Sequence, residues 1–331
     1  MSLYNAWISG VGFYAPSKIL TNADLEKMVD TNNEWIVSRT GIRERHIADP
    51  SQKTSDLAFE AGLKALKMSG VSAEEIDLII VATITPDMIF PATAALVQDK
   101  LRAVNAGTLD IEAACSGFIY GLSIASQFIQ TGKYKNILVI GAECMSRIVD
   151  WTDRNTCVLF GDGAGAVVVS RASDNNLESR LIDFYLRGAG CYKDLLYIPA
   201  GGSAIPASED TVKNKLHFLK MEGQETFKLA VNNMATSITE VLKANSISPD
   251  KIDWLIPHQA NIRIMKMVAK MTDIDEDKVI INIDRYGNTS AATIPIALAE
   301  YYEKNIIKRG QMVMLVAFGG GMTWGSYLIK F

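Results

Sequence analysis

Cys115 is the residue of this sequence whose setting most favours covalent chemistry. It stands in the run A-A-C-S-G-F, after an expected strand that includes Leu109–Ile111. The stretch from Phe118 to Ile129 that follows is apolar on nearly every side and predicts a buried helix. A thiol at a helix N-terminus feels the positive end of the helix dipole, which lowers its pKa and favours the thiolate that forms thioesters. An inert buried cysteine that only fills space is the alternative.

His258 and Asn288 also follow expected strands. His258, in P-H-Q-A-N, comes after Trp254–Ile256, and Asn288, in Y-G-N-T-S-A-A, comes after Val279–Ile283. Catalytic groups in α/β sheets usually lie at the carboxyl ends of strands. Taken alone, a structural histidine is slightly the better interpretation, and an asparagine after glycine commonly serves a turn.

The sequence contains a repeat that relates these positions. The phrase V-S-A-E-E-I-D-L-I-I from Val71 matches I-S-P-D-K-I-D-W-L-I from Ile247, with Asp77 and Asp253 in register. A helical pattern precedes each phrase and an apolar strand pattern follows it, which is typical of α/β layers with buried sheets. A twofold axis between two such halves would bring the cysteine, the histidine and the asparagine toward one site.

The predicted fold class is therefore α/β, with duplicated halves and helices both between and outside two sheets. We expect an N-terminal half at 1–175 with the cysteine, an irregular connecting segment at 176–214, and a C-terminal half at 215–331 with the histidine and asparagine. Glycines and prolines punctuate the stretch from Gly188 to Glu209. Loops that border a pocket and a plain surface connection fit that stretch equally well.

Two glycine runs have different expected roles. The run G-D-G-A-G-A from Gly161 leads into Val167–Val169 rather than into a helix, so we predict a tight hairpin turn and not a nucleotide loop. Gly319-Gly320-Gly321 would let backbone N–H groups approach a ligand closely. Such N–H groups could stabilise an oxyanion.

Composition limits the class of partner. The chain of 331 residues has a net charge of −4 and a pI near 5.5, so no overall basic field would attract nucleic acid. The sequence has no secretory leader and no apolar run near the roughly 18 residues that a membrane helix needs, which predicts a cytoplasmic protein with no membrane partner. The four cysteines form no C-x-x-C pair and the histidines number three, so we expect no metal site.

One helix face is basic. Arg263, Lys266 and Lys270 recur at helical spacing after His258 and share a face. A solvated charge stripe and a docking surface for an acidic partner are both compatible with this pattern.

The motifs A-A-C-S-G-F, P-H-Q-A-N, Y-G-N-T-S-A-A and F-G-G-G-M-T-W-G, in this order, resemble β-ketoacyl-acyl-carrier-protein synthase III. Members of this family are the initiating condensing enzymes of type II fatty-acid synthesis. The resemblance spans essentially the whole chain and includes D-T-N-N-E-W-I-V-S-R-T-G, T-P-D-M-I-F-P and W-T-D-R-N. It implies a thiolase-like fold, layered α-β-α-β-α, a homodimer, and an acyltransferase that uses CoA thioesters as substrates and needs no cofactor.

The resemblance also implies residue roles. Cys115 would accept the primer acyl group from acyl-CoA, and the N–H groups of Cys115 and Gly320 would form the oxyanion hole. His258 and Asn288 would hold the malonyl-acyl-carrier-protein thioester and stabilise its enolate as carbon dioxide leaves. The carbanion would then attack the acyl-cysteine to give β-ketoacyl-acyl carrier protein.

Further positions match the family's binding residues. The CoA and pantetheine positions are Trp35, Arg39, Arg154, Phe227 and Asn261. Phe90 would cross the dimer interface into the acyl tunnel of the partner, and the basic face of Arg263, Lys266 and Lys270 would dock the carrier protein. Two positions depart from the family pattern, Gln224 and Met322, and concern the pantetheine contacts and the acyl pocket.

Other functions remain compatible with the same residues. A related Cys-His-Asn condensing enzyme could prime secondary-metabolite synthesis of the polyketide type. A hydroxymethylglutaryl-CoA synthase would need a glutamic acid that the sequence does not identify. A Cys-His-Asn hydrolase would release a free acid, and a non-catalytic scaffold would tolerate Cys115→Ala.

Overall fold

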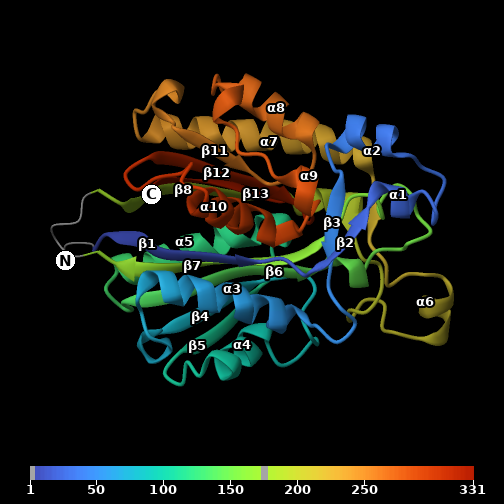
Figure 1. Ribbon diagram of the computed structural model, residues 1–331, viewed down its shortest axis with the longest axis horizontal. Coiled ribbons are helices and arrows are strands. Elements are labelled where there is room, and N and C mark those ends of the chain that lie inside the picture. The colour runs from blue at the N-terminus through green and yellow to red at the C-terminus, as the bar shows by residue number, and fades with distance from the viewer. Residues whose placement is uncertain (1–3, 173–177) are drawn as a thin grey trace.

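Two β-sheets face each other across a layer of helices in the computed structural model, which describes residues 4–172 and 178–331 (Figure 1). The first sheet has the order β1-β7-β6-β4-β5. Its strands are β1 (Ala6–Tyr14), β4 (Leu78–Ala82), β5 (Gly107–Ile111), β6 (Asn136–Cys144) and β7 (Asp162–Arg171). Strands β6, β4 and β5 are parallel, whereas β7 is antiparallel to both β6 and β1.

The second sheet repeats this topology. It has the order β11-β12-β13-β8, with strands β8 (Arg180–Gly188), β11 (Trp254–Pro257), β12 (Met312–Gly319) and β13 (Thr323–Lys330). Strands β11 and β12 are parallel, and β13 is antiparallel to both β12 and β8. The order β8-β13-β12-β11 therefore corresponds to β1-β7-β6-β4 of the first sheet.

The position that corresponds to β5 is occupied by a single parallel bridge between Leu255 and Val279. The strand predicted over 279–283 is thus wrong in extent. The side chain of Gln259 takes over part of its role, because it donates to Ile280 O at 3.0 Å and accepts from Asn282 N at 2.9 Å.

The repeated aspartates serve the same purpose in both halves. Asp77 Oδ2 accepts from the backbone N–H groups of Lys135 and Asn136 at 2.7 and 3.0 Å, where β6 begins. Asp253 Oδ2 accepts from Met312 N at 2.7 Å, where β12 begins. Each aspartate fixes the start of the neighbouring parallel strand, which explains why the repeat includes it.

Helices form three layers around the sheets (Figure 1). Helices α3 (Thr54–Ser69) and α4 (Thr93–Leu101) cover the outer face of the first sheet, and α7 (Gly223–Ala244) and α8 (Ile262–Met271) cover the outer face of the second. Helices α5 (Gly117–Gln130) and α10 (Thr293–Glu303) lie between the sheets, which agrees with their almost wholly buried side chains. The predicted α-β-α-β-α layering is confirmed.

Several short elements complete the fold, and α1, α2, β2 and β3 lie on the side of the molecule at which α6 projects (Figure 1). They are β2 (Lys18–Thr21), α1 (Asn22–Leu25), α2 (Asn33–Thr40), β3 (Glu44–Ile47), β9 (Leu196–Tyr197), α6 (Glu209–Lys213), β10 (Lys220–Met221) and α9 (Ile283–Tyr286). Within the described residues, no helix combines the length and apolar character required to cross a membrane.

The glycine run begins at Gly161, directly before strand β7, and continues inside that strand. The predicted hairpin turn is therefore wrong. Close packing is the physical reason for its glycines. A Cβ on Gly161 would lie 2.4 Å from Tyr286 O, and a Cβ on Gly165 would lie 2.5 Å from Ile296 N. Both contacts are with the C-terminal half, so the glycines let the two halves approach each other.

The connecting segment at 176–214 contains β8, which belongs to the second sheet, and also β9 and α6. It is therefore not irregular throughout. The proposed boundary between residues 175 and 176 lies outside the described residues, and the division into two halves and a connection stays a prediction.

Candidate active site

Cys115 lies in a tight turn between β5 and α5, the 3-10 helix η2 (Ala114–Ser116). Ala114 has a φ of +46°, an unusual backbone conformation for a residue with a Cβ. Two hydroxyls stabilise the turn, because Ser116 Oγ and Thr323 Oγ1 donate to Ala113 O at 2.8 and 2.9 Å. The backbone turn that carries Cys115 is consequently held in part by Thr323 of β13, in the other half.

Burial dominates the acidity of Cys115. The side chain is 7% exposed, and burial raises the pKa of its thiol to about 12. The net pKa is therefore raised and not lowered as predicted, because loss of hydration disfavours the charged thiolate. The resting cysteine is a neutral thiol that must lose its proton to react.

His258 follows β11 and is 3% exposed. Its backbone N–H donates to Val316 O at 2.7 Å, and its Nδ1 is hydrogen-bonded to Thr293 Oγ1 at 2.7 Å. The Thr293 hydroxyl also lies 3.1 Å from Ser290 O. Burial lowers the pKa of His258 to about 3, so the imidazole is neutral, and no hydrogen bond from the described residues reaches its other ring nitrogen, Nε2.

Asn288 lies directly before the 3-10 helix η7 (Ser290–Ala292), which precedes α10. Its backbone is held by the first half, since Asn288 N donates to Leu159 O at 2.9 Å and Gly161 N donates to Asn288 O at 3.1 Å. The side-chain Oδ1 accepts from Ser290 N at 2.8 Å. This contact orients the carboxamide and leaves its NH₂ group as the donor for a ligand.

The predicted catalytic residues line one cavity of about 200 Å³. Cys115, His258 and Asn288 share it with Phe227 and Asn261, the two positions expected along a pantetheine channel. Cys115 comes from the first half and the others from the second. The structure thus brings together three side chains whose individual contexts left their roles open.

A second cavity of about 790 Å³ also reaches Cys115. Gly320, Leu196 and the loop that includes Gly201 and Gly202 line it. Residues of the connecting segment therefore border a pocket, which was one of the two interpretations of their glycines. Cys115 lies where the two cavities meet, so its acyl group could extend into one while a second substrate enters the other.

The Gly319–Gly321 run lies at the β12–β13 turn. A Cβ on Gly319 would lie only 2.6 Å from Cys115 N. The backbone at the end of β12 thus packs directly against the turn of the cysteine, and Gly320 lines the adjoining cavity. This placement is compatible with the predicted oxyanion hole.

The predicted CoA residues cluster at α2. The guanidinium carbons of Arg39 and Arg154 lie 4.8 and 4.9 Å from the ring centroid of Trp35. Arg154 also pairs with Asp30 at 3.2 Å. The three residues form a cationic aromatic platform suited to a stacked base and its phosphates.

The predicted docking residues lie on α8. Asn261 caps this helix by accepting from Arg263 N at 2.8 Å, and the Arg263 guanidinium carbon lies 5.5 Å from the Phe227 ring centroid. Lys266 pairs weakly with the exposed Glu276 at 3.4 Å, and Lys270 is exposed. The basic face is thus partly neutralised.

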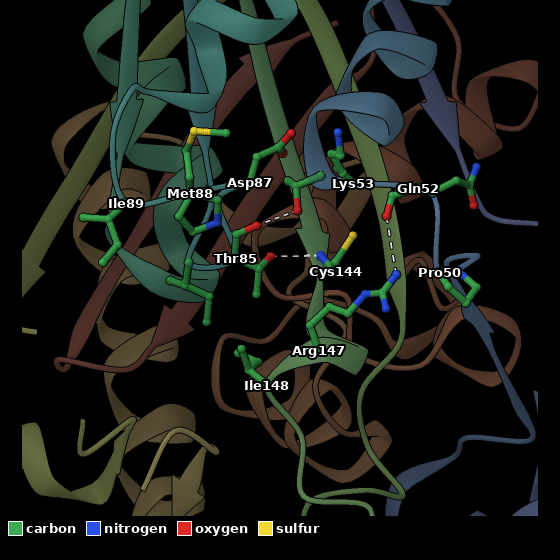
Figure 2. A pocket seen from close by; sticks show the side chains of 13 residues that line it. Pro50, Gln52, Lys53, Thr85, Asp87, Met88, Ile89, Cys144, Arg147 and Ile148 are labelled. Atoms are coloured by element: carbon green, nitrogen blue, oxygen red, sulfur yellow. Dashed lines mark hydrogen bonds between the residues drawn. The ribbon is translucent and has the colours of Figure 1, made fainter. Parts of the chain in front are cut away.

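Phe90 lies apart from the residues that share the catalytic cavity and is 86% exposed. Next to it, Ile89 borders an open hollow of about 470 Å³, in which Arg147 and Cys144 are also seen (Figure 2). None of the predicted catalytic residues lines this hollow.

Sequence reasoning missed the residues that support the site. Ser290 and Gln259 were part of recognised motifs, and Thr293 directly follows one, but none of the three received a role. Glu143 was missed altogether, although an acidic residue in the otherwise apolar strand N-I-L-V-I-G-A-E-C is itself a signal.

The chain matches two family models, 3-oxoacyl-[acyl-carrier-protein] synthase III at residues 109–190 and its C-terminal model at 242–331. It is 56% identical over 325 residues to the β-ketoacyl-[acyl-carrier-protein] synthase III of Caldanaerobacter subterraneus subsp. tengcongensis, which covers 98% of this chain and 97% of that protein. The chain belongs to the β-ketoacyl-acyl-carrier-protein synthase III family.

Solved structures agree with this family. The 3-oxoacyl-[acyl-carrier-protein] synthase III of Aquifex aeolicus is 47% identical with a TM-score of 0.91, over 98% of this chain and 100% of that one. The priming β-ketosynthase of the R1128 polyketide pathway is also similar, at 29% identity and a TM-score of 0.90, over 99% and 96% of the two chains. The thiolase-like fold class predicted from the motifs is therefore confirmed.

Proposed function

We propose that this protein catalyses the decarboxylative condensation of an acyl-CoA primer with malonyl-acyl carrier protein. The products are β-ketoacyl-acyl carrier protein, CoA and carbon dioxide, and the reaction initiates type II fatty-acid synthesis. The observation that carries the assignment of roles is the common cavity of Cys115, His258 and Asn288 in a member of this family.

In the first half-reaction, the sulfur of Cys115 attacks the acyl-CoA carbonyl. The N–H groups of Cys115 and Gly320 stabilise the oxyanion, and CoA leaves. Trp35, Arg39 and Arg154 bind the CoA nucleotide, which their mutual packing supports.

In the second half-reaction, His258 and Asn288 donate hydrogen bonds to the malonyl thioester carbonyl. The charge of the enolate develops on that oxygen as carbon dioxide leaves. The low pKa of the buried His258 supports this role, because a neutral imidazole and a carboxamide can both donate without introducing a buried net charge. The role requires the Thr293 hydroxyl to donate to Nδ1, which places the single ring proton on Nε2. The enolate carbon then attacks the acyl-Cys115 thioester.

The binding partners complete the proposal. Arg263, Lys266 and Lys270 dock the acidic carrier protein, with Phe227 and Asn261 along the path of its pantetheine arm. A homodimer is supported by the exposed apolar pair Ile89 and Phe90, at 90% and 86% exposure. Phe90 would then line the acyl tunnel of the partner.

The enzyme would work in the cytoplasm on CoA thioesters and without a cofactor. Among the described residues, no cluster of three or more His, Cys, Asp or Glu side chains is placed to hold a metal ion. The alternative is a condensing enzyme that primes polyketide synthesis. The solved polyketide-priming relative has the same fold but is less similar in sequence to this chain than the synthase III relatives are.

Mass spectrometry can test the proposal. The protein is incubated with a panel of acyl-CoAs and malonyl-acyl carrier protein, and acyl-Cys115 and β-ketoacyl product are measured. Cys115→Ala should abolish the adduct, and Asn288→Asp should suppress condensation far more than acylation. Failure to form a Cys115 adduct with any short acyl-CoA would refute the function, and equal loss of both steps in Asn288→Asp would contradict the role of Asn288.

A further inference from the structure

Glu143 is a fully buried carboxylate near the nucleophile, and no cation among the described residues pairs with it. It lies near the end of β6, and neutral donors surround it. Thr85 Oγ1 and Thr83 Oγ1 donate to Glu143 Oε2 at 2.5 and 3.1 Å, and the N–H groups of Ile84 and Thr85 approach within 3.2 Å. Figure 2 shows how Thr85 is itself held by Cys144 N, at 2.9 Å.

Such a carboxylate is costly to bury, and it has no role in the half-reactions described above. Burial raises its pKa to about 7, although the hydrogen bonds from Thr85, Ile84 and Thr83 and the nearby Ser290 hydroxyl act in the opposite direction. A group poised near neutral pH can both accept and return a proton.

Ser290 connects this carboxylate to the nucleophile. The turn η7 packs between β6, which carries Glu143, and η2, which carries Cys115. The Ser290 hydroxyl is fully buried and has no hydrogen-bond partner of good geometry among the described residues. It lies close enough to both Cys115 and Glu143 to lower the pKa of each, against the larger effect of burial.

We propose that Glu143 accepts the proton of the Cys115 thiol and that the Ser290 hydroxyl relays it. The inference rests on the proposed function and adds the proton path that this function leaves open. Ser290 takes the thiol proton on Oγ as its own proton passes to the Glu143 carboxylate, and the sulfur forms its bond to the acyl carbon. CoA leaves as a thiolate and is protonated by solvent.

The same path runs backward at the end of the cycle. When the malonyl-derived carbanion attacks acyl-Cys115, the carbon–sulfur bond breaks and the cysteine leaves as a thiolate. Glu143 returns its proton through Ser290 to that sulfur. The carboxylate is regenerated, and the cycle consumes one solvent proton for each CoA released.

His258 is a poorer acceptor for this proton. Burial holds its pKa near 3, whereas burial raises the pKa of Glu143 to about 7. Among the described residues, the thiols of Cys115 and Cys144 are the titratable groups whose pKa values Glu143 shifts. Both are neutral in the resting site because burial raises the pKa of each to about 12. The pH dependence near neutrality should therefore belong to Glu143.

The test is the rate of Cys115 acylation by an acyl-CoA, followed by rapid mixing and mass spectrometry from pH 5.5 to pH 9. In the unmodified protein the rate should fall as pH falls through about 7, because the relay needs the Glu143 carboxylate. Ser290→Ala should slow acylation at pH 8 by at least about 100-fold, the usual contribution of a proton-transfer group. Glu143→Gln should do the same and remove the inflection, while Glu143→Asp should restore part of the rate.

Ala114 adopts nearly the same positive φ as Ser290, at +46° and +49°, so alanine fits the backbone at position 290. Ser123→Ala is the matched control, because Ser123 is a buried serine whose hydroxyl donates to Ile119 O within α5. Decarboxylation of malonyl-acyl carrier protein without primer should fall far less than acylation does in Ser290→Ala, because decarboxylation needs no proton transfer from Cys115. That readout separates loss of the relay from collapse of the site.

The relay is overturned if Ser290→Ala acylates within twofold of the unmodified protein, or if the inflection near pH 7 survives Glu143→Gln. If Glu143→Gln does not fold, the rate and pH profile of Ser290→Ala still decide the question. If the unmodified protein forms no Cys115 adduct at all, the proposed function itself is refuted. Failure of the relay and failure of the proposed function are therefore distinguishable.

Discussion

Gly319→Ala should move the nucleophile without changing any reactive group. The added Cβ would lie 2.6 Å from Cys115 N, 3.1 Å from Ala114 Cβ and 3.1 Å from Ser116 N. Ordinary contacts begin at 3.4 Å, so β12 and the cysteine turn must separate by about 0.8 Å. These neighbours are mostly backbone in a tight turn and cannot rotate away.

The expected effect is large on rate and moderate on stability. A misplacement near 1 Å in an active site costs about 100-fold in rate, so acylation of Cys115 should fall by roughly that factor. Overpacking of a filled interior costs about 1–3 kcal/mol in the free energy of unfolding. The rate should therefore fall in protein that remains folded.

The assay is the rate of acyl-Cys115 formation, measured beside urea unfolding. Gly190→Ala is the control, because a Cβ there meets nothing within 4 Å and both properties should be unchanged. Acylation of Gly319→Ala within about twofold of the unmodified protein would refute the reasoning, since it would show that the turn adapts without loss of alignment.

Three further predictions concern the support of the site. Thr293→Val should slow malonyl decarboxylation by about 10–100-fold, because it removes the hydrogen-bond partner of His258 Nδ1. Thr289→Val is the control and should leave this rate unchanged, because the Thr289 hydroxyl has no hydrogen-bond partner among the described residues. Burial raises the pKa of Glu143 from 4.5 to about 7 in the folded protein, so the free energy of unfolding should fall by about 3 kcal/mol as pH rises from 4.5 through 7. Urea unfolding at pH 5 and pH 8 should show this fall in the unmodified protein and not in Glu143→Gln. Trp35→Leu should raise the KM for acyl-CoA about 5–30-fold with little change in kcat, as loss of a cationic aromatic contact requires, and steady-state kinetics would show it.

The sequence was informative where a local pattern decides the structure. Alternating helix and strand patterns predicted the layers, and the repeat around Asp77 and Asp253 predicted the duplication, because each aspartate binds the start of an adjacent strand in its own half. The motifs around Cys115, His258 and Asn288 predicted residues that share a cavity. Each of these patterns is visible in residues that are close together in the chain, even where the contact that it predicts joins distant residues.

Other features depend on contacts between distant segments. The pKa of Cys115 is governed by burial, which no local context reveals, and this effect reversed the predicted shift. Gly161, directly before β7, and Gly165, within it, allow close packing against Tyr286 O and the start of α10 in the other half, so their run was misinterpreted as a turn. The strand expected near Val279 is reduced to one bridge because Gln259 supplies hydrogen bonds from another loop.

The duplication also explains why each half supplies different catalytic groups to one site. The turns η2 and η7 each begin with a residue of positive φ, Ala114 and Ser290, and each leads into a helix of the central layer. At the next position one turn carries Cys115 and the other Ala291. Strained turns persist only where their surroundings hold them, so the shared geometry belongs to the scaffold. One copy of the turn presents the nucleophile, and the other presents Ser290, whose N–H orients Asn288 and whose hydroxyl is the relay of the proton path proposed above.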